Sequence, residues 1–171
     1  MEIRTIEPFL DYFGKIRERT RRVVVLIPPE KLEWAPRERA WSFGDLVRHR
    51  GVIERWMFAE NVSGRPSRYP GHGKDLADGY DAVLAYLDRM HAEAMALLAA
   101  LTPDALQARG TTPGGASLPA WKWLRAMVEH EIHHRGQIYL MLGMIGVPTP
   151  PLYGLTSEEV KDRSLAGEMH G

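Results

Sequence analysis

The chain has 171 residues, 44% of them hydrophobic, which predicts a single domain spanning residues 1–171. Its 22 basic residues balance its 22 acidic residues, so no positive excess predicts nucleic-acid binding. No apolar run approaches the roughly 18 residues of a membrane span, and the absence of cysteine excludes disulfides, thiolate ligands and a cysteine nucleophile. Because the N-terminus is charged where a signal peptide would be apolar, we expect a cytoplasmic protein.

Two amphipathic segments in the first part of the chain predict helices. Apolar residues at three- and four-residue spacing predict a helix over residues 6–27, which a pair of prolines ends. A second helix, over residues 42–62, opens at Ser42, a good N-cap, and Asp45 completes a variant of the capping box. Its apolar stripe includes His49, at a position where leucine would be the less costly choice.

The rest of the chain carries two more helical patterns. The third helix is predicted over residues 75–101, with His91 on its apolar stripe. The fourth is predicted over residues 117–145, with Ser117 as its cap and Pro119 in its first turn. Since we find no strand-period alternation of any length, we expect an all-α fold, a four-helix bundle.

The clearest chemical signal is a pair of histidines on the fourth predicted helix. His130 and His134 lie four positions apart, so both imidazoles project from one helix face and can share a metal ion. A single core histidine is more often hydrogen-bonded than bound to metal, but this pair together with His49 on a facing stripe favours a metal site. Three neutral imidazoles suit Zn, Ni or Fe, and affinity alone does not select among them.

A different interpretation covers the same residues. The segment from His130 to His134 satisfies the H-E-x-x-H pattern of zincin proteases, in which Glu131 is the general base. The third ligand would then be a downstream carboxylate, Glu158 or Glu159. Because a zincin usually binds its peptide substrate along a strand and no strand is predicted, we do not favour a protease.

Two longer strings resemble the DinB/YfiT-like superfamily. The fourth-helix string HEIHHRGQIYLMLGMIGVPTP is similar to the family hallmark, a helix ending in HHRGQ and followed by an exit with glycine and proline. The string WSFGDLVRH resembles the other landmark, a capped Trp-Ser segment that leads to a histidine. The resemblance spans the whole chain. It implies a four-helix bundle, often a homodimer, in which His49, His130 and His134 bind one Zn or Ni ion and water completes the coordination.

The resemblance leaves the reaction open, and three hypotheses follow. Family members include transferases and isomerases that use bacillithiol or mycothiol, which implies a metal-dependent S-transferase acting on a small-molecule substrate. Since the chain lacks cysteine, a low-molecular-weight thiol would supply the sulfur. A metal-dependent hydrolase would instead use metal-bound water, with Glu131 or a nearby histidine moving protons. The third hypothesis is a metal-stabilised binding protein without catalysis.

The neighbours of the histidine pair are expected to be mainly structural. His133 points roughly 100° away from His130 on the helix, so it would contact a neighbouring helix or support the site by hydrogen bonding. Arg135 and Gln137 are expected to anchor interhelical hydrogen bonds, and Gly136 to permit close helix packing.

Other histidines and three tryptophans are weaker candidates. We expect His91 to be a hydrogen-bonded core or pocket-lining residue, and His72 and His170 to be solvated. Aromatic residues in a bundle are more often plain core than part of a pocket above the metal, and this applies to Trp41, Trp56 and Trp123.

Overall fold

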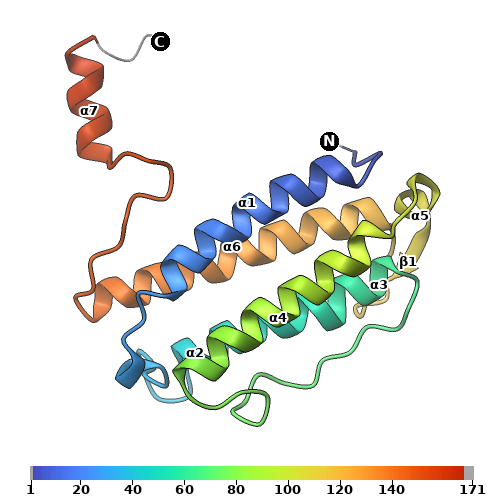
Figure 1. Ribbon diagram of the computed structural model, residues 1–171, viewed down its shortest axis with the longest axis horizontal. Helices are drawn as coiled ribbons and strands as arrows, with labels where there is room; N and C mark the ends of the chain where they lie inside the picture. The colour runs from blue at the N-terminus through green and yellow to red at the C-terminus, as the bar shows by residue number, and fades with distance from the viewer. Residues whose placement is uncertain (1, 168–171) are drawn as a thin grey trace.

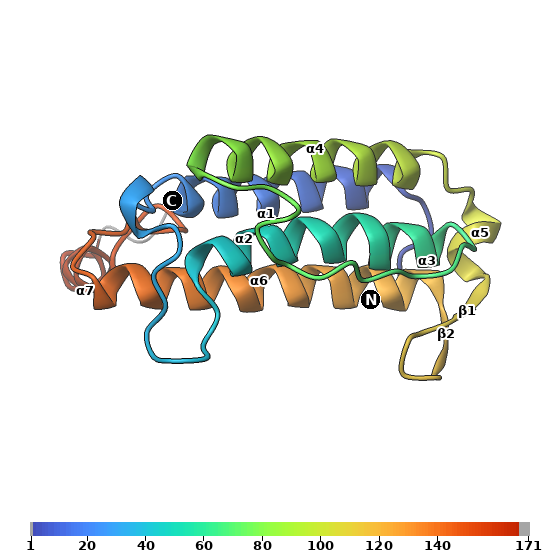
Figure 2. The same ribbon diagram turned by 90° about the horizontal axis from the view of Figure 1, so that it is seen from below.

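Four long helical segments pack side by side in the computed structural model, which describes residues 2–167 (Figures 1 and 2). They are α1 (Glu7–Val24), a continuous second segment, α4 (Tyr80–Ala99) and α6 (Ala120–Met144). The second segment consists of α2 (Phe43–Val52), the π-helical η2 (Ile53–Ala59) and α3 (Glu60–Val62). In the bundle α1 packs on α6 and α2 packs on α4. The predicted all-α four-helix bundle is confirmed.

Local hydrogen bonds explain where the second segment begins. The Ser42 side chain accepts a hydrogen bond from the Asp45 backbone N–H at 3.0 Å, and the Asp45 carboxylate accepts one from the Ser42 N–H at 3.0 Å. This reciprocal capping box satisfies two backbone donors that the first turn of a helix leaves free. The predicted cap is therefore confirmed, and it sets the start of the helix that carries His49.

The start of α6 differs from the prediction. Ser117 is not its cap but begins β2 (Ser117–Pro119), which pairs antiparallel with β1 (Arg109–Thr111), and Pro119 precedes the first helical residue. The expectation of no strand was thus wrong. Strands of three residues are too short to show a period-two pattern in the sequence. The short helix α5 (Pro103–Gln107) leads into this hairpin.

Three other boundaries also differ. The first helix ends at Val24 rather than at residue 27, and α4 begins at Tyr80 rather than at residue 75 because Gly79 adopts a φ of 86°. The short η1 (Pro29–Lys31) follows the first helix. A further helix, α7 (Ser157–Leu165), was not predicted and lies beyond the end of α6 (Figure 1).

A polar layer divides the hydrophobic interior of the bundle. One cluster of buried apolar residues includes Phe13 and Leu124, and a second includes Leu87 and Ile138. Between these clusters along the helices lie buried charged and polar side chains, namely Arg17, Thr20, Arg50, Glu54, Glu131 and His134. The functional candidates therefore lie at the middle of the bundle. Among the described residues, no helix is long and apolar enough to cross a membrane.

Candidate metal centre

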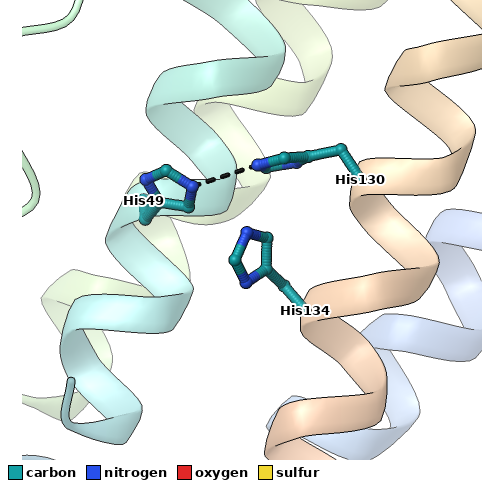
Figure 3. Close-up of side chains that lie close together, drawn as sticks. All are labelled: His49, His130 and His134. Carbon is teal, nitrogen blue, oxygen red and sulfur yellow. Dashed lines mark hydrogen bonds between the residues drawn. The ribbon is translucent and has the colours of Figure 1, made fainter. Parts of the chain in front are cut away.

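Three histidines from two helices converge at the polar layer. His49 on α2 faces His130 and His134 on α6 (Figure 3), and one nitrogen of each lies within 4.8 Å of the others. The Nε2 atoms of His49 and His130 are 3.0 Å apart. The His130 and His134 rings, one helical turn apart, have centroids separated by 4.4 Å. The structure thus brings together all three residues of the predicted metal set.

Burial keeps these imidazoles neutral near pH 7. Desolvation, followed by the charge of the neighbouring imidazoles, lowers the pKa of His49 to about 3. Desolvation likewise lowers the pKa of His130 to about 3, with His134 as the next cause. The pKa of His134 is also lowered, chiefly by burial. Metal ligation requires the neutral imidazole, so the site holds its histidines in the form that binds a cation.

Hydrogen bonds at the second ring nitrogens fix the orientation of two ligands. Nδ1 of His134 lies 2.6 Å from Oε1 of Gln137, which as an acceptor places the proton on Nδ1 and leaves Nε2 free. Nδ1 of His49 lies 2.9 Å from the Tyr69 hydroxyl. Both rings therefore point Nε2 towards the shared centre. Three neutral imidazole nitrogens within 4.8 Å of one another fit the donor set of one divalent metal ion.

The zincin interpretation does not agree with this geometry. Glu158 and Glu159 are exposed on α7, beyond the end of the bundle (Figure 1), and the Glu159 carboxylate accepts a hydrogen bond from the Thr156 N–H at 2.7 Å. Within residues 2–167 the third member of the histidine cluster is His49, and no carboxylate joins it. The alternative of a downstream carboxylate ligand was therefore wrong.

Glu131 lies beside the site but faces away from it, into a buried ion network. Its carboxylate accepts hydrogen bonds from Arg50 Nε at 3.1 Å, from Arg50 Nη2, and from Arg17 Nη1 at 3.2 Å. Burial alone raises the pKa of Glu131, but the two guanidiniums outweigh it and hold that pKa well below its usual range. The pair Arg50–Glu131 links α2 to α6 directly behind the three histidines.

The network continues to the first and third long helices. Arg17 Nη2 donates to the Leu87 carbonyl of α4 at 3.1 Å, and Arg17 Nε lies 3.7 Å from Glu54. Nδ1 of His91 lies 2.5 Å from Glu54 Oε1, so His91 is hydrogen-bonded as expected. Sequence reasoning missed Arg17, Arg50 and Glu54. All three are charged residues at helix positions that face the interior. Because such residues are almost never fully buried unless paired, their positions could have indicated a buried ion network.

The loop between α3 and α4 covers one side of the site. The Tyr69 hydroxyl bridges His49 and His72, with 2.5 Å to Nδ1 of His72. The Trp41 ring lies 4.6 Å from the His49 ring and 4.3 Å from the His72 ring. His72 is thus half-buried beside the site, and the expectation that it is solvated was wrong. The prediction missed Tyr69, because a tyrosine in a loop carries no spacing signal.

The π-helical segment explains why this loop stays on the site. The carbonyl of Trp56 accepts a hydrogen bond from the Arg68 N–H at 2.8 Å, and the carbonyl of Met57 accepts one from the Ser67 hydroxyl at 3.2 Å. A π-helical stretch changes the spacing of backbone partners and so makes carbonyls accessible to groups outside the helix. The loop is fastened to η2 immediately before Tyr69.

The expectations for the neighbouring residues had mixed outcomes. Arg135 Nη1 donates to the Ile16 carbonyl of α1 at 3.4 Å, which confirms its interhelical role. Gln137 instead bonds within its own helix, to His134. Gly136 is exposed, and a Cβ there would meet no atom within 4 Å, so its predicted packing role was wrong. His133 is exposed, with its ring 4.9 Å from that of His134.

The three tryptophans have separate surroundings. Trp41 contacts the site, whereas Trp123 packs on Phe58 with ring centroids 4.7 Å apart. The guanidiniums of Arg55 and Arg68 lie over the Trp56 ring, 4.1 and 4.0 Å from its centroid. Only the first of the three is therefore beside the histidine cluster. His170 lies outside the described residues.

Comparison with known proteins places the chain in a family. Residues 12–138 match a family model described as the DinB superfamily. The uncharacterized protein YrdA of Bacillus subtilis (strain 168) is 24% identical over 162 residues, covering 91% of this chain and 92% of YrdA.

Two solved structures support the fold. A DinB-like protein from Bacillus cereus ATCC 10987 superposes with a TM-score of 0.71 at 20% identity, covering 86% of this chain and 97% of that one. The DinB-like protein YjoA from Bacillus subtilis gives a TM-score of 0.69 at 19% identity, covering 86% of this chain and 98% of that one. At this level of identity the similarity concerns the fold alone.

Proposed function

The chain belongs to the DinB superfamily, and we propose that it is a metal-dependent enzyme of the thiol S-transferase kind. In this proposal His49, His130 and His134 bind one Zn or Ni ion. The observation that carries it is the convergence of three neutral imidazoles, from two helices, within 4.8 Å. Three protein ligands leave a position for substrate, as in catalytic rather than structural zinc sites.

The chain's residues prepare the site for a thiol that the protein does not itself contain. A metal bound here would supply Lewis acidity, which lowers the pKa of a thiol and favours its nucleophilic thiolate. Because the chain has no cysteine, the sulfur would come from a low-molecular-weight thiol of the bacillithiol or mycothiol type. Gln137 and Tyr69 hold the rings of His134 and His49 in the binding orientation before any ligand arrives.

Two groups near the site have different roles in this proposal. Glu131 is a weak base, since two guanidiniums occupy its carboxylate, and it acts as a positioning residue between α2 and α6 rather than as the predicted general base. Tyr69 and His72 lie on the outer side of His49, where their hydrogen bonds hold that ring in its orientation.

A hydrolase that uses metal-bound water is the second candidate. A cavity of about 490 Å³ opens beside His134 and has room for a small ester or amide as well as for a thiol. The hydrolase hypothesis assigned proton transfer to Glu131. It loses support because two guanidiniums bind the carboxylate of that residue. A non-catalytic, metal-stabilised protein is disfavoured because structural zinc sites usually have four protein ligands, and the described residues bring three together. Homodimer formation and a cytoplasmic location stay predictions.

Metal content tests the site. Inductively coupled plasma mass spectrometry on tag-free protein is expected to find about one equivalent of Zn or Ni in the wild type. The His49→Ala variant should lose the metal. The matched control His133→Ala changes an exposed histidine on the same helix as His134 and should keep it. A wild type that stays metal-free after reloading would remove the basis of the proposal.

Activity assays separate the two candidate reactions. Metal-loaded protein is incubated with a chlorinated aromatic electrophile in the presence and absence of a small thiol, and separately with ester and amide panels. We expect turnover only with the thiol, and loss of that turnover in His49→Ala. Hydrolysis of an ester or amide without thiol would instead support the hydrolase.

A further inference from the structure

Several cavities of the bundle are lined by a pair of arginines, and two of these cavities differ in charge balance. One cavity, of about 560 Å³, lies between the start of α1 and the outer face of α6. Its wall contains Arg4 and Arg125 but also Glu2 and Glu129. The positive and negative groups in this wall are equal in number, so the cavity has no preference for a charged ligand of either sign.

The other cavity adjoins the candidate metal centre and is positively charged. It measures about 490 Å³, and His134 forms part of its wall. The loop before α2 contributes Arg37 and Arg39, and no aspartate or glutamate is among the described residues that line it. Glu38 lies 3.7 Å from Arg39, but both side chains are 90% exposed, so this ion pair is weak.

The backbone at Arg39 adds a second observation. Its φ of 61° lies in the left-handed region, which residues other than glycine and asparagine rarely adopt. Such strain is retained where the surrounding structure holds it, and it is frequent in loops that bind ligands. Here it occurs at a residue that lines the cavity, and the exposed Arg39 side chain is free to turn towards a ligand there.

The remainder of the wall is mainly apolar and open to solvent. Trp41, Leu140 and Met144 line it with exposed fractions of 37%, 67% and 57%. Large apolar side chains exposed together at a concave surface mark a binding site more often than a bare surface. Methionine adapts to the shape of a partner because its side chain is flexible and polarisable. The wall therefore fits a ligand with an apolar body and a negatively charged end.

We propose that this cavity is the substrate pocket and that it selects a small apolar carboxylate. Arg37 and Arg39 bind the carboxylate. Trp41, Met141 and Met144 contact the apolar body, and the other end of the molecule reaches His134. A guanidinium matches the planar geometry of a carboxylate, with two parallel hydrogen bonds. The role as a substrate pocket rests on the proposed function, whereas binding of the carboxylate itself requires no metal.

Nuclear magnetic resonance of isotope-labelled methionine methyl groups tests the pocket. Phenylbutyrate is titrated into zinc-loaded and into metal-free wild-type protein, and phenylbutyramide serves as the neutral analogue. We expect the Met141 and Met144 signals, assigned by substitution with leucine, to shift in both forms, and that of Met90, buried against α2, to stay constant. The carboxylate should bind at least about fivefold more tightly than the amide.

Charge-matched variants identify the groups responsible. The double variant Arg37→Gln/Arg39→Gln should lose the preference for the carboxylate, while Arg4→Gln/Arg125→Gln, with the same loss of charge in the balanced cavity, should keep it. An unchanged Met90 signal in each variant verifies that the bundle is folded.

Three results would overturn the proposal. The first is the absence of shifts at Met141 and Met144, and the second is equal affinity for phenylbutyrate and phenylbutyramide. The third is a preference for the carboxylate that occurs only with zinc and survives loss of both arginines. In the last case the metal, not the arginines, binds the carboxylate. A protein that binds no metal yet keeps the arginine-dependent preference would refute the proposed function and leave the pocket standing.

Discussion

The orientation of the His49 and His134 rings depends on the contact made by Nδ1, the ring nitrogen that faces away from the shared centre. His134 is held by Gln137 within one helix turn, whereas His49 is held by Tyr69 from a loop twenty positions away in the chain. Groups of this kind fix the tautomer and orientation of metal-binding histidines, and their loss weakens metal affinity even though they do not touch the metal.

Removing the Tyr69 hydroxyl should therefore weaken metal binding without unfolding the protein. We expect Tyr69→Phe to lower zinc affinity about tenfold, because the His49 ring loses its outer hydrogen bond. Competition with a chromophoric zinc chelator measures the change. Tyr12→Phe, at an exposed tyrosine on α1, is the control. Equal affinity in wild type and Tyr69→Phe would show that the loop contact does not orient the site.

Glu131 illustrates a buried charge whose removal leaves others unpaired. Arg50 and Arg17 are almost fully buried, and both donate to its carboxylate. We expect Glu131→Gln to lower the free energy of unfolding by about 3–5 kcal/mol, since two guanidiniums lose their counter-charge. Urea denaturation measures the change. Glu129→Gln, at an exposed position on the same helix, should behave as wild type, and a similar result for Glu131→Gln would contradict the argument.

At the scale of the elements, two contacts place α2 against its neighbours. The Arg50–Glu131 pair fixes α2 relative to α6, and Gly51 allows α2 to approach α4. A Cβ on Gly51 would lie 3.3 Å from side-chain atoms of Met90 and of Tyr86. Three consecutive residues of one helix, His49 to Gly51, therefore belong to the candidate metal centre, carry a buried charge and form a close helix contact.

Two of the helical glycines, Gly51 and Gly136, should respond differently to substitution. Gly136→Ala adds a methyl group in open space on a helix, so we expect a gain of roughly 0.5–1 kcal/mol from the higher helix propensity of alanine. At Gly51 the same gain is offset by the tight contact with α4, and Gly51→Leu should destabilise by about 1–3 kcal/mol or more. Thermal unfolding of the three variants makes the comparison. A stabilising Gly51→Leu would refute the close contact.

For the whole molecule, the buried histidines make stability depend on pH. The native pKa of both His49 and His130 is about 3, below the ordinary histidine value of 6.5 that applies to the unfolded chain. Between these values the unfolded state binds more protons than the native state. The stability that the neutral histidines contribute to the metal-free protein is therefore fully present above roughly pH 6.5. It is lost as the pH falls from that value towards about 3.

Urea titrations of metal-free protein at about pH 7.5 and about pH 5 test this dependence. We expect the wild type to be less stable at the lower pH. The double variant His49→Gln/His130→Gln should show a smaller difference, while His133→Gln, at an exposed histidine, should match the wild type. The lower pH lies above the ordinary glutamate pKa of 4.5, so the carboxylate of Glu131 contributes little to the difference. The same pH difference in the double variant and the wild type would contradict the assignment.

The sequence by itself determined the four long helical segments, apart from their exact ends, and the identity of the three histidines. Periodicity of apolar residues and the capping residues Ser42 and Asp45 act locally, over one or two helix turns, and so can be read along the chain. The spacing of His130 and His134 is also local. The third histidine, His49, followed from its place on an apolar stripe and from the family resemblance.

The tertiary structure alone decided which groups surround those histidines. Glu131 meets Arg17 across 114 positions of sequence, and Tyr69 and His72 reach the site through a loop fastened to a π-helical segment. Neither arrangement leaves a periodic signal, because each depends on how helices distant in sequence pack and on which backbone groups become free to bind. Local spacing therefore specifies the candidate metal ligands, whereas packing specifies their charge state, their orientation and the pocket beside them.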